Sequence, residues 1–201
     1  MIDRRAFLAS TAAILAAGPL RAAPVPVDRL SAYFNAIETA EARFLQLNDD
    51  GTQSTGTLYL HRPGRARFEY DPPGQALVIA GAGAVAIFDG RSNAAAPEQY
   101  PLKQTPLWLI LERNVNLAGK DMVVGHFEAS GSTILALQDP EAPENGRIEL
   151  VFKPNPTRLA GWVVVDGGGS RTQVVLDELK TGMSLSARLF SITQEVNSHS
   201  R

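Results

Sequence analysis

The sequence predicts a mainly β protein, built as one antiparallel sheet or open barrel with flanking helices. Short apolar or alternating runs recur along most of the 201 residues, and clusters of Gly, Pro, Asn and Asp separate nearly all of them. The alternation of strands and crossover helices that is typical of a parallel sheet is not found. We therefore expect antiparallel strands, joined mostly by hairpins, in a single domain.

Residues 1–23 are typical of an export signal rather than of a folded element. Arg4 and Arg5 precede an apolar, alanine-rich run over Ala9–Ala17. That run is far shorter than the ~20 residues that a bilayer-spanning helix needs. We expect a twin-arginine-like signal peptide over 1–23 and, after its cleavage, one domain over 24–201 that is soluble in the periplasm.

Charge and cysteine content narrow the classes of function. The formal net charge is −2, and the leader carries three arginines and one aspartate, so the mature chain is more acidic still. A weakly acidic protein is a poor candidate for binding nucleic acid or anionic lipid surfaces. Because the chain has no cysteine, disulfides, thiolate metal sites, thiol nucleophiles and a lipid-modified cysteine anchor are all excluded.

The mature chain opens with a predicted amphipathic helix. Leu30, Tyr33, Phe34 and Ile37 recur at helical spacing, and Asp28 is expected to cap the helix N-terminus. The resulting apolar stripe suits either ordinary core packing or a cover over an apolar interior.

The central hairpin lies between residues 56 and 74. Two predicted strands, Thr57–His61 and Ala66–Tyr70, flank a turn in which Pro63 fixes φ and Gly64 accepts a positive φ. The other predicted strands are Glu41–Leu47, Leu77–Ala80, Val85–Asp89, Met122–Glu128, Thr133–Gln138, Arg147–Phe152, Trp162–Val165, Thr172–Leu176 and Ala187–Ile192.

One segment between Gly90 and Gly119 breaks the strand pattern. Thr105 can cap a helix, Pro106 suits its first position, and the five large apolar residues of Leu107–Leu111 follow. A short helix that is apolar nearly all round is either buried on the sheet or covers an apolar opening.

Candidate catalytic and metal-binding groups do not converge. His61, His126 and His199 lack ligand spacing, the carboxylates lie mostly in turns, and no serine sits in a nucleophile elbow. Gly81–Ala86 matches G-x-G-x-x-A formally, but a β-rich run follows it instead of the helix that receives a pyrophosphate. We therefore expect no enzyme, no metal and no cofactor; a periplasmic hydrolase would need a cluster that the sequence does not offer.

These elements together resemble the periplasmic outer-membrane lipoprotein carrier family, the LolA type, over residues 28–192. The matching features are the N-terminal helix followed by Ala42-Arg43-Phe44-Leu45-Gln46, the G-x-L-Y-L-x-R-P hairpin with its aromatic at Phe68, the Asp71-Pro72-Pro73-Gly74 exit, the Phe88-Asp89-Gly90 turn, and the region from Tyr100-Pro101-Leu102 to Leu111. The twin-arginine leader departs from the general-secretory leaders common in the family. Ala80–Ala86 is also smaller than the residues that relatives often carry there.

The resemblance implies an incomplete antiparallel β-barrel closed by a helical lid, with a cavity for the acyl chains of lipoproteins. The implied partners are acylated lipoproteins as cargo, an inner-membrane ABC-type lipoprotein-releasing complex and an outer-membrane acceptor. We expect a monomer without nucleic acid. Two alternatives of the same fold stay open, namely a carrier of free lipid and a lipid-sensing regulatory protein.

The resemblance also assigns the candidate site. Arg62 matches the family arginine that hydrogen-bonds backbone carbonyls of the lid in the closed, empty state, and its five donors suit that task. The other candidate cavity or lid residues are Phe34, Ile37, Phe68, Tyr70, Phe88, Leu107, Trp108, Leu109 and Ile110, for each of which an ordinary place in the core is the alternative.

Overall fold

The computed structural model describes residues 23–89, 96–119 and 121–199, so most of the expected leader lies outside the described residues. The strands are β1 (Thr39–Asn48), β2 (Gln53–His61), β3 (Arg65–Tyr70), β4 (Leu77–Gly81), β5 (Ala84–Phe88), β6 (Glu98–Pro101), β7 (Val123–Ala129), β8 (Ser132–Gln138), β9 (Arg147–Pro154), β10 (Thr157–Val165), β11 (Arg171–Leu176) and β12 (Lys180–Thr181). The helices are α1 (Val27–Asn35), α2 (Trp108–Leu111) and α3 (Ile192–His199), with 3-10 turns η1 (Leu102–Gln104), η2 (Pro143–Asn145) and η3 (Ala187–Phe190).

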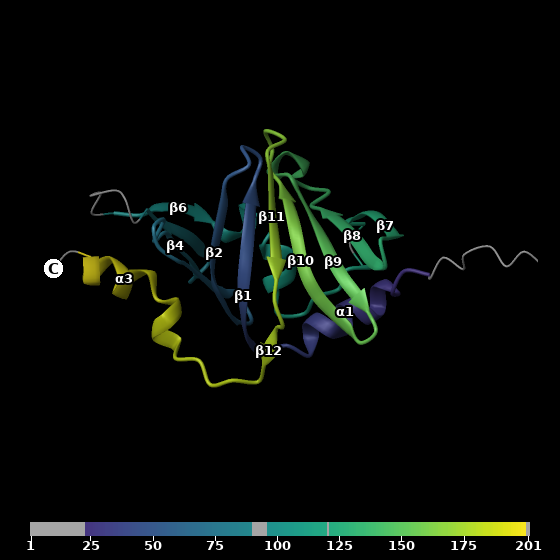
Figure 1. Ribbon diagram of the computed structural model, residues 1–201, viewed down its shortest axis with the longest axis horizontal. Helices are drawn as coiled ribbons and strands as arrows, with labels where there is room; N and C mark the ends of the chain where they lie inside the picture. The colour runs from purple at the N-terminus through teal and green to yellow at the C-terminus, as the bar shows by residue number, and fades with distance from the viewer. Residues whose placement is uncertain (1–22, 90–95, 120, 200–201) are drawn as a thin grey trace, which may run out of the picture.

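All the strands join one antiparallel, 12-stranded sheet in the order β6-β5-β4-β3-β2-β1-β11-β10-β9-β8-β7, with β12 paired to β1. The sheet folds along β1 and β11 into two walls, β1–β6 and β7–β11, seen on either side of Figure 1. The barrel stays open, because the two edge strands, β6 and β7, are not paired with each other. The prediction of a mainly β, incomplete antiparallel barrel is confirmed.

The hairpin of β2 and β3 forms as the alternation predicts. Leu58 pairs with Phe68 and Leu60 with Ala66, and all four side chains are buried. Gly64 takes the positive φ of 72° that the turn requires. Because successive strand residues face opposite sides, Arg62 follows Leu58 and Leu60 toward the concave face.

Gly56 is needed where two aromatic rings meet across the sheet. It pairs with Phe44 on β1 and with Tyr70 on β3, whose rings contact edge to face at 5.2 Å between centroids. A Cβ at Gly56 would lie 2.6 Å from Phe44 Cζ and would also overlap the carbonyl oxygen of Glu69. The missing side chain therefore makes room for the aromatic pair.

The C-terminal segment corrects one predicted strand. Ala187–Ile192, expected to be extended, forms η3 and the start of α3, which lies beside β4 at the outside of the sheet in Figure 1. Ser186 accepts a hydrogen bond from Arg188 N, and Ile192 and Val196 pack on an outer apolar cluster. Local pattern did not separate a strand from a helical turn here because packing on the sheet decides it.

Smaller differences concern element ends. Helix α1 begins after Pro26, so Asp28 lies in its first turn rather than at the cap. Thr105 Oγ1 donates to Leu102 O and thereby closes η1 instead of capping α2. Strand β6, all of whose residues are exposed, had no apolar alternation by which it could be predicted.

We expect Gly56→Ala to lower the free energy of unfolding by about 1 to 3 kcal/mol, because the new Cβ forces Phe44 or the β3 backbone to move. Urea denaturation of the purified chain measures this. The matched control is Gly74→Ala, whose Cβ would meet only Asp71 O at 3.8 Å and should change stability by less than about 0.5 kcal/mol. Equal effects of the two changes would contradict the aromatic explanation.

Candidate functional site

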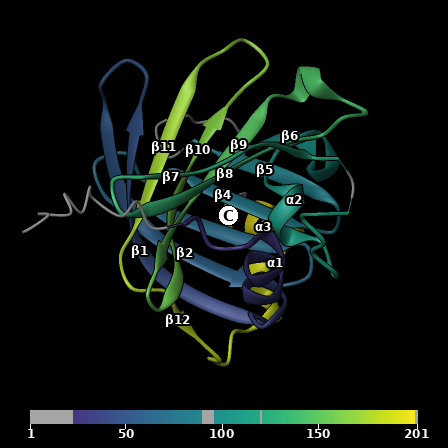
Figure 2. The ribbon, with the colours of Figure 1, turned by 90° about the vertical axis from the view of Figure 1, so that its right-hand side faces the viewer.

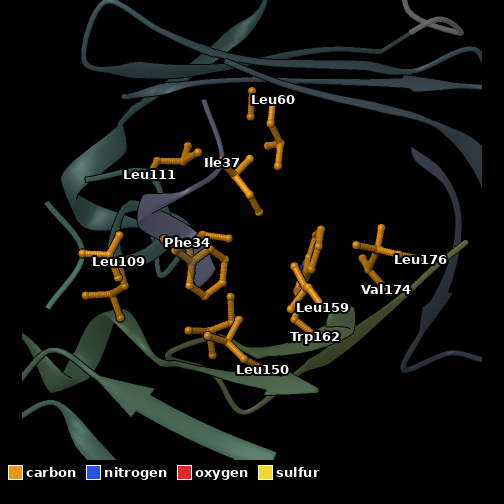
Figure 3. Packing of buried hydrophobic residues seen from close by; sticks show 14 of the residues in the cluster. Phe34, Ile37, Leu60, Leu109, Leu111, Leu150, Leu159, Trp162, Val174 and Leu176 are labelled. Carbon is orange, nitrogen blue, oxygen red and sulfur yellow. The ribbon is translucent and has the colours of Figure 1, made fainter. Parts of the chain in front are cut away.

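Helices α1 and α2 lie on the concave side of the curved sheet (Figure 2). Their apolar residues join one core cluster with residues from both walls. In Figure 3, Phe34 and Ile37 lie between Leu60 of β2 and Leu150 of β9. The covering helices thus fill the interior with their own side chains.

Aromatic side chains form two groups in this interior. Near α1, Tyr33, Phe34 and Phe152 contact one another edge to face, with centroids 5.7 to 5.8 Å apart. A second group continues from the pair at Gly56, because Phe68 contacts both Phe44, at 5.8 Å, and Trp162, at 6.2 Å. The second group joins the two walls of the sheet.

Arg62 fastens both covering helices to the hairpin tip. Its guanidinium Nη1 donates to Phe34 O and, at 3.1 Å, to Ile37 O at the end of α1, while Nη2 donates to Glu112 O at 2.6 Å just after α2. The last carbonyls of a helix lack intrahelical partners and accept such bonds readily. The hydrogen bonds expected of Arg62 from the family resemblance are therefore present; its part in ligand binding stays a prediction.

Two backbone hydrogen bonds at the same place reinforce the guanidinium. Arg62 N donates to Glu38 O at 2.8 Å, and Gly64 N donates to Leu111 O at 2.9 Å. The bond from Arg62 N continues the pairing of β1 with β2, whereas the bond from Gly64 N adds a main-chain link between the hairpin tip and the end of α2.

The cation of Arg62 is buried without a carboxylate. Only 6% of the residue is exposed, and within the described part of the chain every hydrogen bond of the guanidinium goes to a backbone carbonyl, while Nε has no partner. Burial lowers the pKa of Arg62. A charge held only by helix-end carbonyls loses its partners when the helices move, so this contact is sensitive to their position.

A cavity of about 500 Å³ lies beside α2, and Glu112, Asp121 and Glu141 are among its polar lining residues. Trp108, Leu109 and Met122 supply apolar wall, and the first of these carries the Lys103 ammonium 5.6 Å from its ring centroid. Leu109 and Met122 also belong to the core cluster. The cavity therefore adjoins the apolar interior at the covering helix.

The structure brings most of the candidate residues together. Nine of the ten are at the concave side: Arg62 forms the contacts described above, and Phe34, Ile37, Phe68, Tyr70, Leu107, Trp108, Leu109 and Ile110 belong to or pack against the core cluster. Their roles toward a ligand stay predictions.

Phe88 is the exception and corrects the expectation. It packs with Leu77, Ile79 and Ala86 in a separate cluster that α3 covers through Ile192. Its neighbour on the sheet, Leu77, alternates with Val78, which faces the core cluster. Phe88 therefore points to the outer face, because the alternation of β5 does not by itself say which side is concave.

Two interior residues were not among the candidate cavity or lid residues. Trp162 is 4% exposed and joins β10 to Phe68, and Phe44 lies at the centre of the second aromatic group. The alternation of apolar residues in their strands was the available signal, since both fall on the buried face.

The described part of the chain holds neither a metal-binding cluster nor a membrane-spanning helix. Among the described residues, no three His, Cys, Asp or Glu side chains lie close enough to hold a metal ion. No helix within the described ranges is both long enough and apolar enough to cross a bilayer.

The fold and the site define a class of proteins. Its features are an open β half-barrel, helices that cover the apolar interior, and one buried arginine that fastens those helices. The family model described as "Outer membrane lipoprotein carrier protein LolA" matches residues 35–193. The chain belongs to this LolA family of outer-membrane lipoprotein carriers, which are carriers and not enzymes.

Individual relatives agree with the family model. The chain is 31% identical over 172 residues to an outer-membrane lipoprotein carrier protein of Legionella pneumophila (strain Paris), covering 80% of this chain and 82% of the relative. It is 26% identical over 189 residues to one of Azotobacter vinelandii, with 90% and 89% covered. A DUF1329 family protein from Desulfovibrio piger shares the fold at 10% identity and a TM-score of 0.50, covering 84% of this chain and 95% of that one.

We expect stability to fall as the pH rises from about 10 to about 12, in part through Tyr70. Burial raises the pKa of Tyr70 to about 12, and its phenol donates a hydrogen bond to Gln46 Oε1. The folded chain then keeps the phenol proton to higher pH than the unfolded chain. The contribution is complete below the unfolded value of 10.0 and is lost as the pH rises through the folded value.

Urea unfolding across this pH range measures the effect. Tyr70→Phe should flatten the fall, whereas Tyr100→Phe, at an exposed site where Glu98 is the main cause of the raised pKa, should alter it less. An unchanged slope in Tyr70→Phe would contradict the assignment.

Proposed function

We propose that this chain is a periplasmic carrier that binds the acyl chains of lipoproteins released from the inner membrane and delivers them to the outer membrane. Family membership supports this proposal, and one structural observation carries it. Arg62 fastens two helices over an apolar interior through hydrogen bonds that a modest helix movement would break. The described conformation is then the closed, empty state of the carrier.

The energetics of acyl chains explain the need for such an interior. Each buried CH₂ is worth ~0.8 kcal/mol, so a chain of about 16 carbons loses on the order of 12 kcal/mol when it leaves water. In the closed state Phe34, Ile37 and the apolar residues of α2 cover the same surface. Opening without cargo exposes apolar area on both lid and walls, so acyl chains must replace the helices as they leave.

Release requires the reverse exchange. Each hydrogen bond of a charged group contributes about 1.5 to 3 kcal/mol, and re-forming three of them at Arg62 favours the empty state. The carrier therefore combines an interior that accepts acyl chains with a closing force that helps to return them.

The proposal includes the location and partners of the chain. Residues 1–23 act as a leader removed on export, and residues 24–201 work as a monomeric periplasmic domain. Cargo comes from an inner-membrane ABC-type lipoprotein-releasing complex and passes to an outer-membrane acceptor. Free lipid as the natural ligand is the competing outcome, and mass spectrometry of material co-purified from periplasm distinguishes it from acylated protein.

We expect Trp108→Glu to weaken binding of a tripalmitoylated cysteinyl peptide by tenfold or more, because it places a charge where α2 meets the interior. Fluorescence titration with a labelled peptide measures the affinity. The control is Tyr100→Glu, which adds the same charge at a 47% exposed aromatic on β6 and should leave binding unchanged. Unchanged affinity in a folded Trp108→Glu variant would remove Trp108 from the site.

We expect Arg62→Leu to accept lipoprotein but release it poorly, because the loss of its hydrogen bonds favours the open, loaded state by tenfold or more. Arg62→Lys should restore part of the release, since one ammonium cannot bridge the same carbonyls. The measurements are cargo occupancy of each variant isolated from periplasm and transfer to acceptor membranes.

The matched control is Arg65→Leu, at the same hairpin tip but with its guanidinium 6.0 Å from the Phe190 ring on the outer side. It should load and release like the wild type. If Arg62→Leu instead loses loading while release is unaffected, Arg62 captures cargo and the latch explanation is wrong.

A further inference from the structure

The covering layer contains a second set of hydrogen bonds that does not involve the sheet. The Asn35 side-chain amide donates through Nδ2 to Val115 O at 2.9 Å and accepts from Val115 N at 2.9 Å. One turn earlier in α1, Ser31 Oγ accepts from Leu117 N at 3.1 Å. Helix α1 therefore holds the chain that follows α2 along one edge.

The segment of Val115 and Leu117 is held by two kinds of contact, namely its buried side chains and the hydrogen bonds to α1. Val115 and Leu117 send buried side chains into the core, 3% and 0% exposed, but the segment that carries them belongs to no strand. Asn35 satisfies both main-chain groups of Val115 at once, because its planar amide carries a donor and an acceptor side by side. Asn35 itself is exposed, so burial of its own side chain does not explain its position.

These contacts differ in kind from those of Arg62. Arg62 and Gly64 join the covering layer to the hairpin tip, whereas Asn35 and Ser31 join the two parts of the layer to each other. Without the second set, α2 could separate from the interior while α1 stayed in place. With it, displacement of either helix pulls on the other.

We propose that Asn35 is a positioning residue that makes α1 and residues 108–117 open as one body. Its importance for cargo rests on the proposed carrier function. If the two parts move as one body, all of the hydrogen bonds of the Arg62 guanidinium break or form in one step, so loading and release become two-state. The coupling itself is a property of the empty chain and is tested there.

The test weakens the contact of α1 with β10 and measures the response in α2. Tyr33→Phe removes the hydroxyl that accepts a hydrogen bond from Leu159 N at 3.0 Å but keeps the ring contacts of α1. Residue-resolved hydrogen exchange on the unliganded chain follows the amides of Leu109, Ile110 and Glu112, which are bonded within the α2 region and do not touch Asn35.

With Asn35 intact, Tyr33→Phe should raise exchange about fivefold both in α1 and at the α2 amides, the factor that one hydrogen bond corresponds to. In Asn35→Ala with Tyr33→Phe, the rise should be confined to α1. Alanine has the higher helix propensity, so Asn35→Ala keeps the intrinsic helicity of α1 while it removes the two bonds to Val115. Asn114→Ala, at an exposed asparagine of the same segment, is the control and should preserve the joint response.

Two results would overturn the proposal: a Tyr33→Phe effect confined to α1 when Asn35 is present, or a joint response that survives Asn35→Ala. Titration with the tripalmitoylated cysteinyl peptide is run in parallel on the same variants. Joint exchange without peptide binding contradicts the carrier function and leaves the role of Asn35 standing. Peptide binding without joint exchange supports the carrier function and contradicts the role of Asn35.

Discussion

The structure depends on how one buried guanidinium is solvated. Arg62 lies at a hairpin tip, 6% exposed, and within the described chain its guanidinium donates hydrogen bonds only to carbonyls at the ends of α1 and α2. A buried charge without partners is costly, so the helices that supply those carbonyls and the hairpin that supplies the charge stabilise one another's position. The position of α1 and α2 over the half-barrel follows from this mutual requirement.

The covering layer is needed because the sheet is open. A sheet that ends at β6 and β7 leaves its concave face without a third wall, and the apolar residues of that face must be covered by something apolar. Here the cover is α1 with α2, which contribute side chains such as Phe34 and Leu109 to the same cluster. Under the proposed function, a cover made of short helices on loops can be exchanged for acyl chains more readily than a strand could.

Sequence reasoning reached the fold and part of this site for identifiable reasons. The β2–β3 hairpin was predictable because alternation and Pro63-Gly64 specify it locally, and Arg62 because the family resemblance names its partners. The predictions for Phe88 and for Ala187–Ile192 were wrong. The curvature of the sheet and packing on its outer face, and not the local pattern, decide which side Phe88 faces and which structure Ala187–Ile192 adopts. Asn35 was out of reach, since its partner Val115 is 80 positions away in a segment without periodicity.

Hydrogen bonds suit a latch better than apolar packing does. Apolar contact weakens gradually as surfaces separate, whereas a hydrogen bond weakens steeply once its geometry is lost. A cover held by packing alone would open by degrees, and cargo would meet a continuous series of partly open states. Three bonds at Arg62, felt together if Asn35 keeps the layer in one piece, instead separate a closed state from an open one. Under the proposed function, that separation lets a carrier hold acyl chains fully or not at all.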